Sequence, residues 1–413
     1  MLRAQTQERM RVRRPGWLLV LLGTVTGIGP FSMDMYLPAL PHIGDEFRAS
    51  PSHVQLTLTA CLVGLAAGQL LIGPLSDRWG RRRPVLAGLG LYAVTSLLCA
   101  VAPSVETLTI ARLGQGVAGG AAVVIARAVV RDLHSGAAAA AYFSRLVLVF
   151  GVAPVVAPSV GGVVLRVTGW RGIFVVLTAI GVLVLAAAFA GLPETLPPAR
   201  RHAGGLADTV HGMRALLRDR GYLGYVLALG LAGAGLFAYI SGSSFALQRV
   251  YGASPQLYGL LFGLNALGFV LVGQLNGRLV HRVPPQRLLS TGLVVLVSAA
   301  LALLLATRWH NLLAVAVPLF VFMSMLGMVL PNTTALALDL HPERAGAASA
   351  LLGAAQSLCG AIIAPLVGLG GAGSATPMAL AMTASAAGGM VAFAFVARPA
   401  SRAPADHEEA PVL

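Results

Sequence analysis

Long runs of apolar residues alternate with short polar segments along almost the whole chain. A transmembrane helix needs about 20 consecutive apolar residues to cross the roughly 30 Å of hydrocarbon in a bilayer, and twelve runs meet this length. Their predicted limits are 17–38, 53–75, 84–103, 106–130, 142–166, 171–192, 221–245, 257–279, 287–307, 311–335, 346–369 and 375–396. The pattern therefore predicts an all-α membrane protein with twelve transmembrane helices joined by short loops.

The longest polar interruption, residues 197–220, is rich in arginine and separates six predicted helices from six. We expect it to be a cytoplasmic linker between an N-terminal six-helix bundle, 17–196, and a C-terminal six-helix bundle, 221–397. Residues 1–16 and 398–413 are expected to be cytoplasmic tails. The first apolar run is too long for the apolar region of a signal peptide, so we expect it to be a retained helix.

The two halves match at a shift of 200 residues, in the segment that follows the second helix of each half. The matching pairs are Gly68 and Gly268, Leu71 and Leu271, Gly73 and Gly273, Leu75 and Leu275, Arg78 and Arg278, Arg82 and Arg282, and Pro84 and Pro284. Such a repeat predicts two pseudo-symmetric bundles and an alternating-access carrier with its site at their interface.

Composition supports this prediction, because 57% of the residues are apolar and 11% are charged, against roughly a quarter charged in soluble domains. This excludes a soluble, fibrous or disordered protein. All 29 basic residues are arginine; 22 fall in predicted cytoplasmic segments, 5 in outer loops and 2 in the fourth helix. This asymmetry places both termini in the cytoplasm and explains the net charge of +14 without nucleic acid as a partner.

Sequence signals for a cofactor or a metal are absent. Cys61, Cys99 and Cys359 lie in or at the end of apolar runs, with no histidine at ligand spacing. No phosphate-binding loop, nucleophile elbow or zinc-protease motif is present, so we expect no cofactor, no bound metal and no enzymatic activity.

A charged loop joins the second and third predicted helices. It reads Gly73-Pro-Leu-Ser-Asp77-Arg78-Trp-Gly80-Arg81-Arg82-Arg83. This run resembles the inner-loop pattern of the major facilitator superfamily, G-x-x-x-D-R-x-G-R-R. A carboxylate at a helix end can accept hydrogen bonds from the amides that open another helix, and glycine permits a tight reversal.

The resemblance implies a conformational latch in this loop. Asp77 would bind the start of the eleventh helix near Gly346, and Arg81 would pair with Asp132. The second half departs from the pattern, since Gly277 stands where the first half has Asp77. The alternative is a basic loop that only fixes topology.

Asp34 is the only carboxylate well inside a predicted helix. Burial favours the protonated form of a carboxylate and a bound cation favours the ionised form, so Asp34 is a candidate exchanger of a proton for substrate. The alternative is a structural residue near the end of a helix interrupted by Gly27, Gly29 and Pro30.

The residues around Asp34 carry a narrower resemblance. The run Met33-Asp34-Met-Tyr36-Leu-Pro38-Ala-Leu-Pro41 is similar to the first helix of the bicyclomycin/chloramphenicol-resistance branch of the superfamily. Further matches are Gln55-Leu-Thr-Leu-Thr59, Gly169-Trp170-Arg171 and Leu192-Pro-Glu-Thr-Leu196. Thr26 stands where some drug/proton antiporters have a second carboxylate, so the resemblance implies a one-carboxylate mechanism.

Arg112 lies in the fourth helix, in the run Leu108-Thr-Ile-Ala-Arg112-Leu-Gly-Gln115-Gly116, which resembles a second pattern of the superfamily. An arginine inside a membrane needs an anion, a carbonyl group or water. By family analogy Arg112 assists proton release. The alternative is a side chain that snorkels to the outer surface.

The fifth predicted helix carries a set of helix-bending residues: Gly151, Pro154, Pro158, Gly161 and Gly162. The set resembles the antiporter motif G-P-x-x-G-G, except that Ala157 replaces a glycine. Prolines bend a helix, and glycines let a neighbouring helix approach closely.

Five further polar or amphipathic residues inside predicted helices are candidate substrate contacts: Tyr36, Tyr239, Asn265, Asn332 and Gln356. Isolated polar residues in membrane helices are more often helix-to-helix contacts than ligand contacts.

The sequence thus predicts a bacterial inner-membrane secondary transporter that exports small, largely apolar drugs by exchange for protons. A monomer in the bilayer is expected, with drug and protons as partners. One alternative is a proton-coupled symporter that imports a small metabolite on the same fold. A membrane-embedded receptor or enzyme is disfavoured, because no catalytic cluster or sizeable extramembrane domain is evident.

Overall fold

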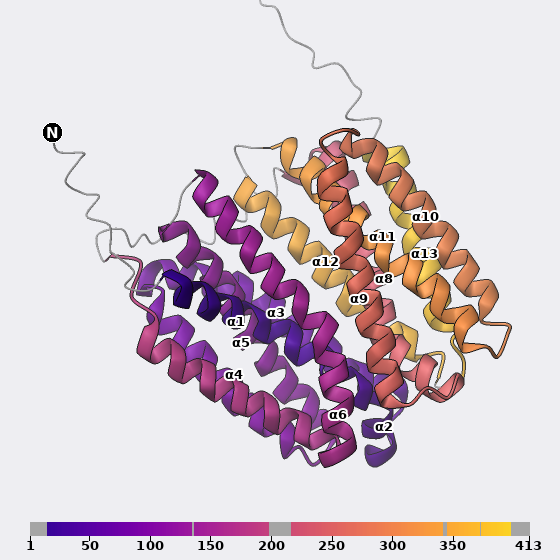
Figure 1. The fold of residues 1–413 in the computed structure, drawn as a ribbon, viewed down its shortest axis with the longest axis horizontal. Coiled ribbons are helices and arrows are strands. Elements are labelled where there is room, and N and C mark those ends of the chain that lie inside the picture. Colours follow the sequence, from indigo (N-terminus) through magenta and orange to yellow (C-terminus); the bar gives the residue numbers. More distant parts are fainter. Residues whose placement is uncertain (1–14, 134–135, 198–215, 342–344, 372, 398–413) are drawn as a thin grey trace, which may run out of the picture.

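The computed structural model describes residues 15–133, 136–197, 216–341, 345–371 and 373–397, and these form helices joined by short turns (Figure 1). Eleven helices of the described part are long and apolar enough to cross a membrane. The predicted tails 1–16 and 398–413 and most of the linker 197–220 lie outside the described residues.

The first half of the chain contains the following elements: α1 (Pro15–Asp34), η2 (Leu37–Ala39), α2 (Leu40–Phe47), α3 (Pro51–Trp79), α4 (Arg82–Ala100), α5 (Val105–Leu133) and α6 (Gly136–Gly191). The second half contains α8 (Arg220–Phe245), η4 (Ala246–Val250), α9 (Pro255–Leu279), α10 (Pro285–Ala306), α11 (Leu312–Asp339), α12 (Ala345–Gly368), α13 (Thr376–Ala392) and η6 (Phe393–Ala397). The two halves form two helical bundles that lie side by side (Figure 1).

Element α6 contains two of the predicted transmembrane helices, 142–166 and 171–192. They meet at Gly169, whose φ of 74° lies in the left-handed region and breaks the helical path. Glycine suits this position because it has no Cβ to clash there. Eleven long helices therefore account for twelve membrane crossings.

The predicted C-terminal boundary of the first helix is wrong, because α1 ends at Asp34 instead of continuing to residue 38. The chain resumes as the short helices η2 and α2. Pro38 and Pro41 lack the N–H groups that a continuous helix would use to bind the carbonyls of Asp34 and Leu37. The break places Asp34 at a helix end.

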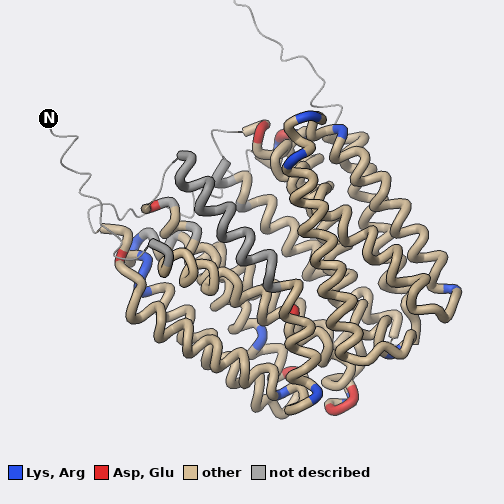
Figure 2. The backbone as a smooth tube through the Cα atoms, viewed as in Figure 1, with Lys and Arg blue, Asp and Glu red and all other residues tan. Residues whose placement is uncertain are grey.

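We call the end of the molecule where α1 begins and η6 ends the terminal end, and the opposite end, where α2 lies, the distal end (Figure 1). Charged residues of the described part concentrate at these two ends (Figure 2). Every side-chain hydrogen bond described between the bundles lies in the distal half. Examples join Ser52 to Pro365, Gln55 to Ser241 and Thr59 to Ala361. In this structure the bundles are thus joined at the distal end.

Candidate functional site

Asp34 ends α1 and lies between the bundles. Its side chain is buried, with 6% of the residue's surface exposed, and it is the only buried carboxylate among the residues whose burial is described. No described side chain or amide donates a hydrogen bond to its carboxyl group. It lies within electrostatic reach of Tyr239 on α8 and Tyr258 on α9. A carboxyl group of the N-terminal bundle therefore faces the C-terminal bundle without a fixed partner.

Arg112 is fully buried inside the N-terminal bundle, so its guanidinium does not reach the surface. Its Nη1 atom donates to the carbonyl of Ser32, at 3.1 Å, and to the side chain of Gln115. The guanidinium lies 4.7 Å from the ring centroid of Tyr36 and 5.8 Å from that of Phe174. It thus contacts residues on both sides of Asp34 in the chain, but does not itself contact Asp34.

Two further donors of Arg112, Nε and Nη2, have no hydrogen-bond partner in the described structure although both are buried. These two atoms form the edge of a guanidinium that binds a carboxylate in a bidentate manner. A buried charge normally has an ionic or hydrogen-bonded partner, because desolvation costs several kcal/mol. This edge is therefore able to receive an anionic group.

A chain of polar side chains extends from Arg112 through the N-terminal bundle. Gln115 donates to Ser96 at 2.8 Å, and the hydroxyls of Ser32 and Tyr92 are within hydrogen-bond distance. Apart from Gln115, none of these residues belongs to a recognised sequence motif. Serines in apolar helices usually bond only to their own backbone, so their participation gives no sequence signal.

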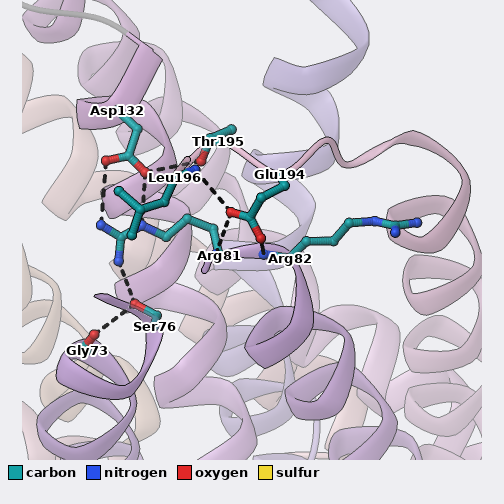
Figure 3. A network of polar contacts seen from close by, with 8 residues as sticks. All are labelled: Gly73, Ser76, Arg81, Arg82, Asp132, Glu194, Thr195 and Leu196. Atoms are coloured by element: carbon teal, nitrogen blue, oxygen red, sulfur yellow. Dashed lines mark hydrogen bonds and ion pairs between the residues drawn. The ribbon is translucent and has the colours of Figure 1, made fainter. Parts of the chain in front are cut away.

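The predicted latch loop carries an ion pair at the terminal end of the N-terminal bundle (Figure 3). Arg81 Nε lies 2.9 Å from Asp132 Oδ2, the pair that the family resemblance implies. Arg81 Nη1 also donates to Ser76 Oγ at 2.6 Å, and Thr195 donates to Asp132 at 3.1 Å. These contacts join α3, the start of α4, the end of α5 and the segment after α6.

Glu194 has contacts at the latch loop that its place in the run Leu192–Leu196 does not predict. Its carboxylate accepts hydrogen bonds from the amides of Arg81, at 2.8 Å, and Arg82, at 3.3 Å, at the start of α4 (Figure 3). A carboxylate satisfies the unpaired amides at a helix start and suits the helix dipole there. Glu194 thereby fixes the chain that leads to the linker onto the latch loop.

Of the other predicted latch residues, the structure describes Gly73, Arg78 and Gly80, but not the side chain of Asp77. Gly80 adopts a φ of 88°, as a tight reversal requires, and Arg78 is exposed near the end of α3, while Gly73 lies one turn earlier. The side chains of Asp77 and of residues 345–347 lie outside the described part of the structure. The contact between Asp77 and the start of the eleventh helix stays a prediction.

The five predicted substrate contacts do not form one cluster. Tyr36 is fully buried in the N-terminal bundle, where its hydroxyl contacts that of Thr57. In the C-terminal bundle Asn265 donates to the hydroxyl of Tyr239 at 2.8 Å, and Gln356 packs beside Gly233.

Asn332, the fifth candidate, lies nearer the terminal end. It donates to Asn276 at 2.6 Å and to the carbonyl of Met328 at 2.8 Å. At the 200-residue shift of the repeat, Asn276 and Asn332 correspond to Ser76 and Asp132. A neutral amide pair thus joins α9 to α11 where the other half has an ion-paired network.

The antiporter-like segment of α6 lies between α1 and α9. A Cβ on Gly161 would overlap the carbonyl oxygen of Met35 and lie 3.2 Å from its Cα, whereas one on Gly162 would lie 2.9 Å from the carbonyl of Pro255. Gly161 therefore permits close contact within the N-terminal bundle, and Gly162 permits close contact with the C-terminal bundle. Pro154 and Pro158 lie in the same helix, and nothing is described around Gly151.

We predict that Gly161→Ala destabilises the protein by about 1–3 kcal/mol, because the added methyl group must displace the backbone of Met35, next to Asp34. Thermal unfolding measures this loss. Gly90→Ala is the matched control, since a Cβ at that helical position meets nothing within 4 Å. Wild-type stability of the Gly161 variant would show that this close approach is unimportant.

Within the described residues, no group of three or more histidine, cysteine, aspartate or glutamate side chains is placed to hold a metal ion.

Comparisons with known proteins agree with this architecture. A family described as the Major Facilitator Superfamily matches residues 22–365. The Uncharacterized MFS-type transporter YdgK of Bacillus subtilis is 42% identical, over 91% of this chain and 94% of its own. The Bicyclomycin resistance protein homolog of Haemophilus influenzae is 32% identical, over 92% and 95% of the two chains. A Chloramphenicol resistance protein of Pseudomonas aeruginosa is 33% identical, over 71% and 70%.

Solved structures show the same fold at low sequence identity. A bacterial homolog of the human lysosomal transporter Spinster, in an inward-facing and unoccupied conformation, has a TM-score of 0.76 at 18% identity, over 94% of this chain and 98% of its own. The xylose transporter XylE of Escherichia coli, partially occluded and inward open, has a TM-score of 0.70 at 14% identity, over 90% and 96%.

Proposed function

Because the chain belongs to the major facilitator superfamily, we propose that this multi-pass membrane transporter exports small, largely apolar drugs in exchange for protons. Asp34 carries the proposal, as the only buried carboxylate of the described residues, between the bundles and without a fixed partner. The names of the relatives, which include resistance to bicyclomycin and chloramphenicol, support the substrate class.

In the proposed mechanism Asp34 carries the proton. It is protonated when the cavity faces one side of the membrane and releases its proton when it faces the other, so drug and proton occupy the carrier in turn. A carboxyl group without fixed hydrogen bonds can make this change without disrupting the fold.

Arg112 assists proton release in this mechanism. Its unpaired Nε and Nη2 edge supports the role, because it can receive the ionised carboxylate when the end of α1 moves. Asp34 is the only buried carboxylate described that could serve as that partner.

The loop from Gly73 to Arg83 acts as the latch of the terminal end. Arg81, Asp132 and Glu194 hold the loop in one shape, and Asp77 binds the start of α12 when the terminal end closes. The basic loop that only fixes topology is disfavoured, because Arg81 is buried and committed to Asp132 and Ser76.

The excess of arginine in the predicted cytoplasmic segments supports a cytoplasmic location for both termini and an inner-membrane location for the protein. In this proposed orientation the distal end faces the outside, and the joined distal ends of the bundles correspond to a conformation closed to the outside. We propose that a monomer is the working unit, because the site lies between the two bundles of one chain.

The substrate contacts are proposed to come from Tyr36, Tyr239, Asn265, Asn332 and Gln356, all on helices of the two bundles. Drug sites are mostly apolar with a few polar groups, so these side chains would orient a drug and the surrounding apolar residues would bind it.

Drug susceptibility of a bacterial host that lacks its own efflux pumps tests the proposed function. Expression of the protein should raise the inhibitory concentration of several unrelated apolar antibiotics, and a proton uncoupler should abolish the accompanying efflux. An importer of a metabolite would leave susceptibility unchanged, or would increase it. The resemblance of the segment with Pro158, Gly161 and Gly162 to the antiporter motif favours export over this alternative.

A further inference from the structure

The segment from Leu37 to Phe47, which follows Asp34, has backbone carbonyls available for contact with the other bundle. Pro41 has no N–H for the carbonyl of Leu37, which accepts a hydrogen bond from the Leu40 amide and has a second lone pair for another donor. Pro38 lies in η2, two residues before the start of α2, and Pro41, three positions later, has no N–H for its carbonyl. Buried carbonyls need a donor, because an unsatisfied one costs about 1–3 kcal/mol.

Two side chains of the C-terminal bundle supply these donors. Ser244, near the end of α8, donates to the carbonyl of Leu37 at 2.6 Å. Gln248, one turn later in η4, donates to the carbonyl of Pro38 at 3.2 Å and to Ser244 Oγ at 2.8 Å. Ser244 is fully buried. The two residues thus form one hydrogen-bonded unit across the bundle interface.

The rest of the segment is attached to both bundles. Glu46 contacts Trp170 and Arg171 of α6, in its own bundle, whereas the neighbouring Asp45 contacts Arg249 of η4, in the other. Because the chain continues directly into α1 on one side and α3 on the other, the segment moves with the N-terminal bundle and separates from η4 when the distal end opens.

We infer that Ser244 and Gln248 are positioning residues for the exchange, which hold the end of α1 and its Asp34 in place while the distal end is closed. The hydrogen bonds exist only in the closed conformation, since opening moves the bundles apart and lets water bind the carbonyls. The inference rests on the proposed function in taking Asp34 as the exchanging group.

The double variant Ser244→Ala/Gln248→Ala should therefore favour the distal-open conformation. Each lost hydrogen bond removes a donor from a carbonyl in the closed conformation, whereas water supplies that donor in the open one. Two such losses should raise the ratio of open to closed molecules by about tenfold or more.

Distances between spin labels measure this ratio without any drug. Labels at Thr107→Cys and His310→Cys, both exposed at the distal end and one on each bundle, would be placed in a protein with Cys61, Cys99 and Cys359 replaced by alanine. The double variant should show a larger population at the longer distance. These distances are measured without drug, so a failure of drug transport would not change them. The two proposals can therefore fail separately.

Ser243→Ala is the matched control, because it removes a neighbouring buried serine whose partner, Tyr258, lies in the same bundle, at 3.2 Å. It should leave the distances unchanged. If the double variant does not fold, Gln248→Ala alone, at a half-buried position, should shift the ratio by a few-fold. Unchanged distances in the folded variants, or an equal shift in the Ser243 control, would overturn the inference.

Discussion

Replacing Asp34 by asparagine should abolish drug exchange driven by a pH gradient, while the protein remains folded. Asparagine has nearly the same shape as aspartate but cannot carry a proton between the two faces of the membrane. The fold should persist, since the described structure gives the Asp34 carboxyl no hydrogen bond to lose. Efflux from vesicles with an imposed pH gradient measures the effect, which should reach the background of empty vesicles.

Two further variants test whether the loss of exchange is specific to the ionisable group at position 34. Asp34→Glu keeps an ionisable group and should retain part of the activity. Asp339→Asn removes an exposed carboxylate at the end of α11 and should exchange at the wild-type rate. Wild-type exchange by Asp34→Asn would rule out Asp34 as the proton carrier.

Arg112→Met should also abolish exchange, because the positive charge beside the end of α1 is lost. Methionine fills a similar apolar volume, and replacing a buried charge by an apolar residue is often neutral or stabilising. Exchange in vesicles and thermal stability in detergent, measured on the same preparation, separate loss of function from loss of fold.

Arg112→Lys distinguishes charge from shape. Lysine keeps the charge and can still donate to the carbonyl of Ser32, so it should retain part of the exchange, although it cannot form the bidentate edge. Full activity of the methionine variant would mean that Arg112 serves packing alone.

The positions of the helices could be predicted from the sequence, because bilayer thickness sets their length. The run predicted at 257–279, for example, is α9, Pro255–Leu279. The end of α1 could not be predicted this way, since the apolar run continues past Asp34 to Pro38 although the helix does not. The positions of Pro38 and Pro41 indicate the end of this helix better than hydropathy does.

The burial of Asp34 and Arg112 followed from their place in apolar runs, but their partners did not. Ser244 and Gln248 bind backbone carbonyls more than 200 residues away, as Glu194 binds distant backbone amides. Backbone groups are the same at every position, so the sequence carries no sign of such a pairing. Only the fold brings these groups together.

Proton movement on drug addition tests the central claim most directly. Purified protein in vesicles that contain a pH-sensitive dye, with no imposed gradient, would receive a drug identified in the susceptibility screen. Drug entering the vesicles should drive protons out and raise the internal pH, and Asp34→Asn should show no change. A fall in internal pH as the drug enters, or drug movement without any change in pH, would contradict proton exchange.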